Sequence, residues 1–168
     1  MKLSAATKLA ERILEELAPL CAVLTVAGSI RRQCAEVNDI DLVAIPHDQY
    51  QFRARVLRNA QPIQDGPVNL IVRLQNNVQL DIFMARAATQ DLIDKRPTNF
   101  GTLLLCRTGS KEHNIKVAHR AISLGLKWKP YEGVLQPTAN GDLLVASTTE
   151  EQIFRTLRMD YIEPMERT

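Results

Sequence analysis

Long hydrophobic runs and cysteines are both scarce in this 168-residue chain. The longest apolar segments, Cys21 to Ala27 and Leu103 to Cys106, are far shorter than the roughly 18 residues that span a membrane. The three cysteines, Cys21, Cys34 and Cys106, are an odd number without Cys-x-x-Cys spacing, which argues against a disulfide framework and against a zinc site. We therefore expect no membrane span, and cysteines that are reduced and serve packing.

A secretory signal is also missing from the sequence. Residues 1–17 carry charges throughout and contain no continuous apolar stretch, so we expect a cytoplasmic protein. The composition, 45% hydrophobic and 24% charged, is close to the average of soluble globular proteins, which argues against disorder. A chain of this length predicts about one typical domain, so we expect a compact unit with at most a small appended lobe.

The sequence has little excess charge of either sign, because its formal net charge is +2. The distribution of charge is more informative than the sum. Residues 107–129 contain six lysines or arginines and one acid, a local balance of +5, whereas residues 148–168 have a balance of −2. Two interpretations of the basic block stay open: a surface that binds a polyanion, or the solvated face of a helix.

Hydrophobic periodicity in the first half predicts helices that alternate with strands. The expected elements are a helix that follows the N-cap Ser4 and ends at Pro19, a fully buried strand 21–27, a strand 39–46, a helix 49–59 capped by Asp48, a loop 61–67, and a hairpin of strands 69–74 and 78–85 around Asn76-Asn77.

Past Ala88 the pattern becomes helical. The expected elements are a short helix 91–95, a helical segment 100–106, a longer helix to Leu124 closed by Gly125, a small hairpin within 126–145 with an Asn140-Gly141 turn, and a last helix opened by a Thr148-x-x-Glu151 capping box. This order predicts the α+β class, with a lobe boundary between Ala85 and Thr98.

A phosphate site is predicted where the strand 21–27 ends in Gly28-Ser29. Such an end exposes backbone N–H groups and a hydroxyl at the start of a helix, where the partial positive charge of the helix dipole favours phosphate. Arg32 follows closely and can add a charge-assisted contact.

Asp39 and Asp41 lie two residues apart on a predicted strand, so their carboxylates project from one face. Two carboxylates about 4 Å apart repel by roughly 1–4 kcal/mol, so such a pair usually needs a cation, above all Mg²⁺. Asp81, the one acid in the apolar run 78–85, would complete a two-metal site for phosphoryl displacement. The alternative is that the first two acids face water and that Asp81 pairs with an arginine such as Arg73.

Together these motifs resemble the nucleotidyltransferase superfamily, and specifically the family X DNA polymerases. The most specific pieces are the Thr-Gly-Ser-x-x-x-Asn segment 108–114 and the Tyr-Ile-Glu-Pro segment 161–164, and the resemblance also covers residues 28–46, the strand around Asp81 and residues 124–134. It implies a nucleotidyltransferase palm with a mixed sheet and helices over residues 1–87, followed by a small α/β thumb lobe, which selects the nucleotide, over residues 88–168.

By this resemblance the chain would add dNTPs to the 3′-hydroxyl of a primer with two Mg²⁺ ions, for which Mn²⁺ would substitute. Asp39 and Asp41 would bind both ions, and Asp81 would join the catalytic ion and help to activate the hydroxyl. The residues that would hold the nucleotide are Gly28, Ser29, Arg32, Gly109 and Asn114. The substrate would be a primer-template or gapped DNA, and the protein would be a monomer that fills short gaps in DNA repair.

The predicted helix up to Leu124 has a polar arc opposite its apolar arc. Its members are candidates for contacts with DNA phosphates, and a solvated helix face is the open alternative. These residues are His113, Lys116, His119 and Arg120.

The chain departs from the family where Cys106 and Arg107 replace two aromatics that usually pack near the sugar. The smaller Cys106 would leave room for a 2′-hydroxyl, and Arg107 could reach it, so weak sugar discrimination and use of rNTPs are expected. Lys111 lies at the first turn of the same helix as Asn114 and is a further candidate for nucleotide contact. No segment before Ser4 is long enough for the family's lyase domain, so we expect no lyase activity.

Two other functions stay under consideration. The chain could be a nucleotidyltransferase that modifies a small molecule or a protein, against which the basic block and the Thr-Gly-Ser-x-x-x-Asn segment argue. It could also be a non-catalytic nucleic-acid-binding module, against which the presence of all three aspartates argues.

Overall fold

The structure is a computed structural model that describes residues 1–89 and 96–167. The short helix predicted over residues 91–95 lies outside the described residues. Contacts within the chain divide it into two compact units, Met1–Ala85 and Arg86–Thr168. In the described ranges, no helix combines the length and the hydropathy that crossing a membrane requires.

The first unit contains one five-stranded sheet, four helical segments and the strand order β1-β2-β5-β4-β3. Its elements are α1 (Leu3–Leu17), η1 (Ala18–Leu20), β1 (Cys21–Val26), α2 (Gly28–Arg31), β2 (Asp39–Pro46), α3 (Gln49–Leu57), β3 (Ala60–Asp65), β4 (Asn69–Leu74) and β5 (Gln79–Met84). The sheet is mixed, because β2 and β5 run parallel while the other neighbouring strands are antiparallel.

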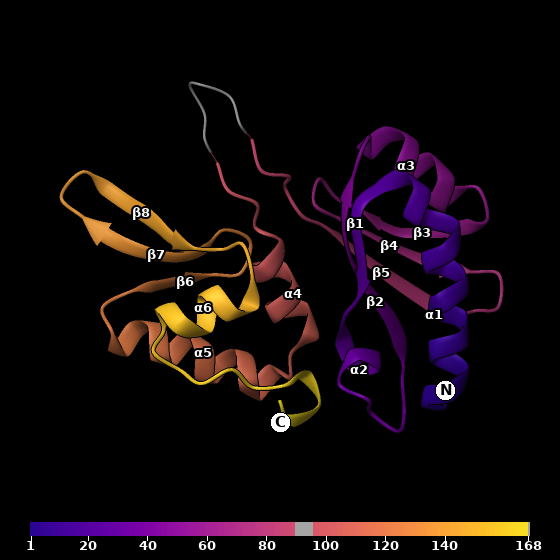
Figure 1. The fold of residues 1–168 in the computed structure, drawn as a ribbon. Coiled ribbons are helices and arrows are strands. Elements are labelled where there is room, and N and C mark those ends of the chain that lie inside the picture. Colours follow the sequence, from indigo (N-terminus) through magenta and orange to yellow (C-terminus); the bar gives the residue numbers. More distant parts are fainter. Residues whose placement is uncertain (90–95, 168) are drawn as a thin grey trace. The chain divides into compact units, whose positions relative to one another are not determined.

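Helices α1 and α3 pack on one face of this sheet (Figure 1). The core between them is apolar because β2 and β5 turn alternate side chains toward the helices, among them Ile40, Leu42, Leu80 and Ile82, which are at most 2% exposed. Since successive residues of a strand point to opposite faces, Asp39, Asp41 and Asp81 belong to the other face of the sheet.

Several local predictions for this unit are confirmed. Asp48 caps α3, because its Oδ1 accepts a hydrogen bond from the backbone N–H of Gln51 at 2.8 Å. Asn77 adopts a φ of 63° in the turn between β4 and β5, a conformation that asparagine tolerates better than most residues. The hairpin of β4 and β5 is therefore present as expected.

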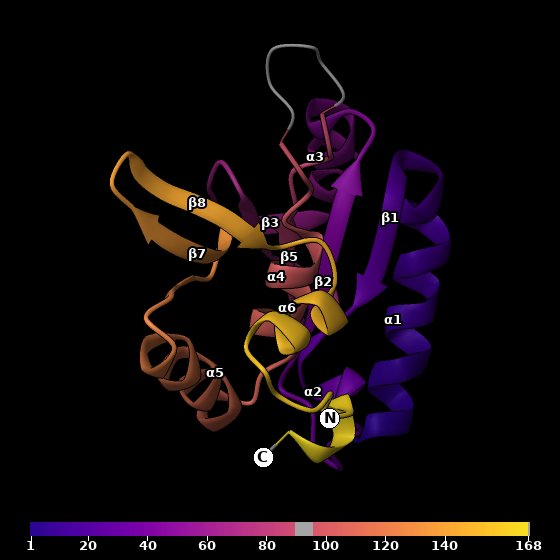
Figure 2. The same cartoon turned by 60° about the vertical axis from the view of Figure 1, so that its left-hand side comes forward.

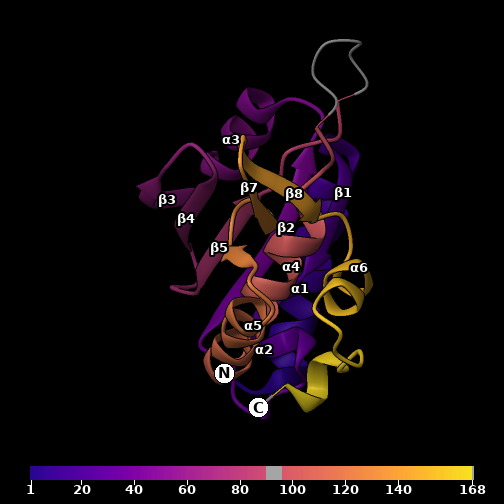
Figure 3. The ribbon, with the colours of Figure 1, turned by 90° about the vertical axis from the view of Figure 1, so that its left-hand side faces the viewer.

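Three predictions for the first unit are wrong. Ser4 is not the N-cap of α1, because the helix already begins at Leu3 and its N-cap, Lys2, makes no side-chain cap. Strand β1 is not fully buried, since it is an edge strand that pairs only with β2 and leaves Val23 39% exposed. Residues 61–67 are not simply a loop, because β3 forms the opposite edge of the sheet (Figure 3).

In its described residues, the second unit packs helices against a three-stranded antiparallel sheet in the order β6-β7-β8 (Figure 1). Its elements are α4 (Phe100–Thr108), α5 (Lys111–Ser123), β6 (Lys127–Lys129), β7 (Gly133–Thr138), β8 (Gly141–Ala146), α6 (Glu150–Thr156) and η2 (Pro164–Glu166). Its core cluster includes Leu105, Val117, Val134, Phe154 and Leu157, all at most 2% exposed. The mixture of sheets and helices in both units is compatible with the predicted α+β class.

The helix ends of the second unit follow the expected chemistry, with one correction. Gly125 follows the C-cap of α5 with a φ of 70°, and the Asn140-Gly141 turn joins β7 to β8. The capping box lies one residue later than predicted, because Thr149 is the N-cap of α6 and accepts from the N–H of Gln152 at 3.1 Å. Gln152 Oε1 in return accepts from the N–H of Thr148 at 3.0 Å.

Candidate active site

The three aspartates lie on two adjacent parallel strands of the first unit. In the register of β2 and β5, Asp41 pairs with Asp81 and Asp39 pairs with Gln79. Because neighbouring strands lie about 4.8 Å apart, the carboxylates of Asp41 and Asp81 start from adjacent positions on one face. Asp41 and Asp81 are therefore direct neighbours across the two parallel strands.

The carboxylate of Asp81 is oriented by a neighbour on its own strand. The side-chain Nε2 of Gln79 donates a hydrogen bond to Asp81 Oδ1 at 2.8 Å. All three aspartates are half-buried. In the described part of the chain, no group of three or more His, Cys, Asp or Glu side chains converges closely enough to hold a metal ion.

Gly28 lies directly against the carboxylate of Asp41. A Cβ placed on Gly28 would lie 1.9 Å from Asp41 Oδ2, and the φ of Gly28 is +59°. Only glycine combines that close approach with that backbone conformation. A backbone hydrogen bond holds the same two segments together. The N–H of Ala27, which follows β1, donates to the carbonyl oxygen of Asp41 on β2 at 2.9 Å.

Ser29 and Arg32 lie in and after α2, at the end of β1 (Figure 2). The Oγ of Ser29 is buried and has no hydrogen-bond partner among the described residues. Since buried hydroxyls are nearly always paired, this one fits a ligand that accepts a hydrogen bond. The helix is four residues long, so its dipole is weaker than the sequence suggested.

In the second unit, the nucleotide candidates Gly109 and Asn114 lie at the junction of α4 and α5. Gly109 is the C-cap of α4, with a φ of 70°. The Nδ2 of Asn114 donates to the carbonyl oxygen of Cys106 at 2.8 Å, while its Oδ1 is buried without a partner in the described ranges. The Cys106 carbonyl fixes the orientation of the amide, because a flipped amide would bring two acceptors together. Asn114 therefore offers one unsatisfied acceptor.

A cavity of about 580 Å³ lies within the second unit, beside these residues. All three sugar and nucleotide candidates, Cys106, Arg107 and Lys111, line it together with Asn114. Burial raises the pKa of the Cys106 thiol to about 12, so the thiol stays protonated at neutral pH and serves packing.

Sequence reasoning missed Tyr131, which also lines this cavity. The guanidinium of Arg107 lies 5.3 Å from the centroid of the Tyr131 ring and donates a hydrogen bond to its phenol oxygen. The backbone at Tyr131 is also held in place, because Asn99 Nδ2 donates a hydrogen bond to the Tyr131 carbonyl oxygen at 2.7 Å. Arg107 and Tyr131 lie 24 positions apart in the sequence, so no local sequence pattern reveals this pair.

The assignment of His113 to DNA phosphates is wrong. Its side chain is 2% exposed and its ring centroid lies 5.8 Å from that of Phe154. Burial, together with the positive charge of Arg167, lowers the pKa of His113 to about 4, so the ring is neutral at neutral pH. A buried neutral ring cannot contact a phosphate backbone.

Arg120 has a structural partner that its sequence position did not reveal. Its Nε donates to the carbonyl oxygen of Leu157 at 2.9 Å and its Nη2 to that of Arg158 at 3.2 Å. These are the carbonyls at the end of α6, which need donors. Lys116 and His119 are exposed on α5, so the surface of the predicted polar arc is formed by these two side chains.

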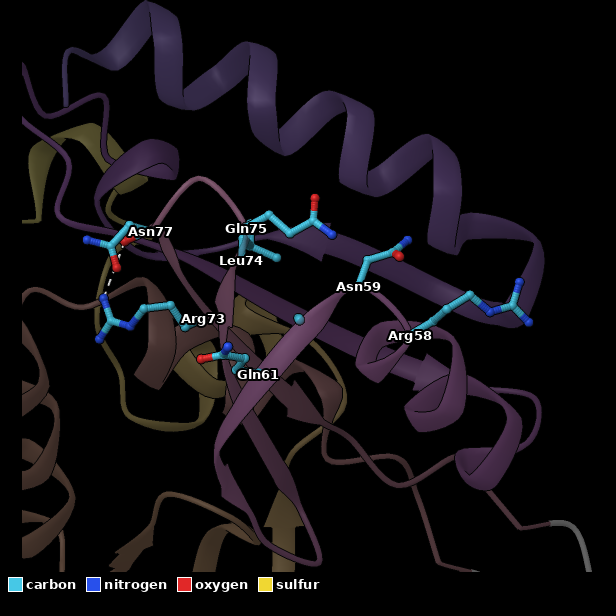
Figure 4. A pocket seen from close by; sticks show the side chains of 8 residues that line it. Arg58, Asn59, Gln61, Arg73, Leu74, Gln75 and Asn77 are labelled. Atoms are coloured by element: carbon cyan, nitrogen blue, oxygen red, sulfur yellow. Dashed lines mark hydrogen bonds between the residues drawn. The ribbon is translucent and has the colours of Figure 1, made fainter.

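A separate cavity of about 410 Å³ lies in the first unit, at the ends of α3 and β4. Figure 4 shows that its two arginines, Arg58 and Arg73, point in different directions, and Arg73 donates to the carbonyl oxygen of Asn77 at 3.3 Å. No residue predicted for the active site lines this cavity.

Residues 103–168 match the family model of the DNA polymerase beta thumb. The match lies within the second unit and includes the cavity residues from Cys106 to Tyr131. No curated protein matches the chain. The similarity supports a polymerase-like thumb and indicates a DNA-binding, polymerase-like protein. The three aspartates lie outside the matched residues.

Proposed function

We propose that the protein is a DNA nucleotidyltransferase that uses Mg²⁺ and adds dNTPs to a primer 3′-hydroxyl, and that it fills short gaps during DNA repair. The observation that carries the proposal is the register of β2 and β5, which pairs Asp41 with Asp81 beside Gly28. The similarity of residues 103–168 to a polymerase thumb supports DNA as the substrate.

The donor set of the first unit fits a pair of hard divalent cations. Asp39, Asp41 and Asp81 supply carboxylate oxygens, which Mg²⁺ prefers. When bound, two such ions would stabilise negative charge on the attacking and leaving oxygens. Mn²⁺ accepts the same oxygen ligands and would substitute.

The phosphates of the nucleotide would be held by the segment after β1. The unpartnered hydroxyl of Ser29 would donate to a phosphate oxygen, and Arg32 would add a charge-assisted contact. The absent side chain of Gly28 would leave room for close approach beside Asp41.

Asp81 would orient the primer 3′-hydroxyl and take up its proton. The bond from O3′ to the α-phosphorus would form as the bond from that phosphorus to the β-phosphate oxygen breaks, and pyrophosphate would leave. The hydrogen bond from Gln79 holds the Asp81 carboxylate in place for this role.

The second unit would contribute contacts to the nucleotide and to DNA. Asn114 would contact the incoming base and Gly109 its sugar, while Lys116 would bind a DNA phosphate. Arg107 is hydrogen-bonded to Tyr131 and lies over its ring. Arg107 would therefore contact a sugar hydroxyl together with Tyr131 and not as an isolated cation.

A non-catalytic DNA-binding module is the second candidate, and one observation favours it. The aspartates do not converge into a group of three metal ligands in the described part of the chain. A protein of this kind would bind DNA through its thumb-like unit and would extend no primer.

Nucleotide addition to labelled gapped, recessed and single-stranded DNA, with each dNTP and Mg²⁺, tests the proposal. We expect extension by the wild type, with the gapped substrate preferred. Asp41→Asn and Asp81→Asn should each lower extension by about 100-fold or more, because each removes a carboxylate from the reacting centre. Asp48→Asn is the matched control, since asparagine caps a helix as well as aspartate does.

Melting curves with and without Mg²⁺ supply a second readout. The cation should raise the melting temperature of the wild type by mass action, and should raise it less in Asp41→Asn. DNA binding without extension by the wild type would favour the non-catalytic module. Near-normal extension by either aspartate variant would contradict the assigned site.

A further inference from the structure

The cavity of about 410 Å³ in the first unit is lined mainly by side chains that donate hydrogen bonds. It lies where β3 begins and β4 ends, and among the described residues that line it none is acidic. Proteins contact the phosphates of nucleic acids through such guanidinium and amide N–H groups. The lining therefore suits an anionic ligand of this kind. Its polar members are Arg58, Asn59, Gln61, Arg73, Gln75 and Asn77.

The two arginines of this cavity are available to an anion. Arg53 and Arg55 on α3 each form an ion pair with an acid. Neither Arg58 nor Arg73 forms an ion pair with the residues that the structure describes. Figure 4 shows that their guanidiniums point in different directions. A ligand with several separated charges, such as a chain of phosphates, meets both guanidiniums more readily than one small anion does.

Part of this cavity belongs to the face of the sheet that carries the aspartates. In the sheet register, Asp39 on β2 pairs with Gln79 on β5. Gln79 in turn pairs with Arg73 on β4, and Arg73 pairs with Gln61 on β3. Residues directly opposite each other on neighbouring strands project from one face. Arg73 and Gln61 therefore continue the row that begins at Asp39.

The proposed reaction determines which DNA strand would come to this side. The attacking 3′-hydroxyl and the leaving pyrophosphate lie in line, on opposite sides of the α-phosphorus. Ser29 and Arg32, proposed for the phosphates of the nucleotide, follow β1 on one side of the aspartates. In the strand order β1-β2-β5-β4-β3, β4 and β3 lie on the other side. The primer strand, which carries the attacking hydroxyl, would therefore approach over β4 and β3.

The spacing fits phosphates near the end of the primer. β3 is two strands away from β5, which is about 10 Å at the usual strand spacing. One strand of a duplex carries a phosphate for roughly every 3.4 Å of helix axis, so about three phosphates span that distance. We propose that this cavity binds the phosphates within about three nucleotides of the primer 3′ end, with Arg58 and Arg73 as the charged contacts. The inference rests on the proposed function and deepens it, because it names a site for the primer backbone.

Neutral linkages in the primer test this site. The probe is a duplex with a recessed primer, in which a single methylphosphonate linkage removes the charge of one phosphate. Its affinity is measured by fluorescence anisotropy without dNTP, so that binding is separated from extension. We expect a neutral linkage among about the last three of the primer to weaken binding by about two- to fivefold, as loss of an exposed ion pair predicts.

Variants of the two arginines show whether the cavity makes this contact. Arg58→Gln and Arg73→Gln should each weaken binding of the unmodified duplex by a similar factor and flatten the slope of log affinity against log salt by about 0.9. In these variants the neutral linkage should cost little further affinity, because both changes remove the same contact. Arg58 is exposed, so loss of its guanidinium leaves the core intact.

Lys8→Gln is the matched control, because it also removes one positive charge. Lys8 is exposed on α1, which packs on the other face of the sheet, and it does not line the cavity. In this variant the neutral linkage should weaken binding as much as it does in the wild type.

The outcomes separate this inference from its alternatives. Additive losses at every primer linkage in both arginine variants would overturn it. Coupling of the arginines to neutral linkages in the template strand, and to none in the primer, would overturn the assignment to the primer. Primer extension by the wild type without any coupling would leave the proposed function standing and refute the cavity site. Coupling in a wild type that extends no primer would support the cavity site and contradict the proposed catalysis.

Discussion

Substitution of Gly28 by alanine tests the candidate active site through a contact that the structure defines closely. The new Cβ would lie 1.9 Å from Asp41 Oδ2, whereas Cβ contacts in proteins begin at about 3.0 Å. The Asp41 carboxylate must therefore move away from the new Cβ by about 1 Å. A displacement of that size at a reacting centre can lower the rate by about 100-fold. The positive φ of +59° adds about 1–2 kcal/mol of destabilisation for any residue with a Cβ.

Gly125→Ala separates the steric effect on Asp41 from the backbone strain of a positive φ. Gly125 has a φ of +70°, yet a Cβ added there meets nothing within 4 Å. We expect both variants to lose about 1–2 kcal/mol of unfolding free energy, measured by urea denaturation. Only Gly28→Ala should lose primer extension, measured as kcat/KM on the preferred DNA substrate. Extension by a folded Gly28→Ala within threefold of the wild type would refute the role assigned to Asp41.

Three further predictions concern stability and sugar selection. Because the pKa of His113 is lowered from 6.5 to about 4, the unfolded state binds more protons between these values, so the free energy of unfolding should decrease as pH falls from about 6.5 toward 4. His113→Phe should show a smaller decrease, and equal slopes in the two proteins would disprove the assignment. Arg167 Nη1 donates to Glu150 Oε1 at 2.6 Å in a buried pair. Glu150→Leu should therefore lower the free energy of unfolding by about 3–5 kcal/mol, because it leaves the charge of Arg167 buried without its partner. Lys129→Ala, at an exposed pair, should lower it by only about 0–1 kcal/mol. A small loss in Glu150→Leu would contradict this reasoning. Cys106→Tyr should raise the ratio of kcat/KM for dGTP over GTP opposite cytosine by about tenfold, if a ring restores about 1.4 kcal/mol of exclusion; a ratio already in the thousands in the wild type would show that another group excludes the 2′-hydroxyl.

The buried cluster around Arg167 illustrates what no local pattern predicts. Arg167 donates to Glu150, and its guanidinium lies 5.5 Å from the ring centroids of both Phe154 and Tyr161. Tyr161 in turn donates to Glu150 Oε2 at 3.2 Å. In the sequence, Glu150 appears only as an acid in the first turn of a helix. Its burial, and that of His113 beside it, arises because separate segments close over one core.

Edge strands show the limit of pattern reasoning in the first unit. Strand β3 contains Gln61, Pro62 and Asp65, so its sequence lacks the alternation of apolar and polar residues that would predict a strand. Most of its side chains are exposed. Backbone hydrogen bonds to β4 hold it in the sheet. A strand of this kind is recognised only from its neighbour, since an edge position accepts proline and polar side chains.

The sequence by itself determined the residue types of the candidate site and part of their geometry. A period of two along a strand placed Asp39 and Asp41 on one face, and Gly28-Ser29 marked the break after β1. The tertiary structure decided the rest. The parallel register of β2 and β5 set Asp81 beside Asp41, and closure of the second unit brought Tyr131 to Arg107. Both contacts join segments far apart in the chain, and strand register and core packing, which bring such segments together, depend on the whole fold rather than on any local run of residues.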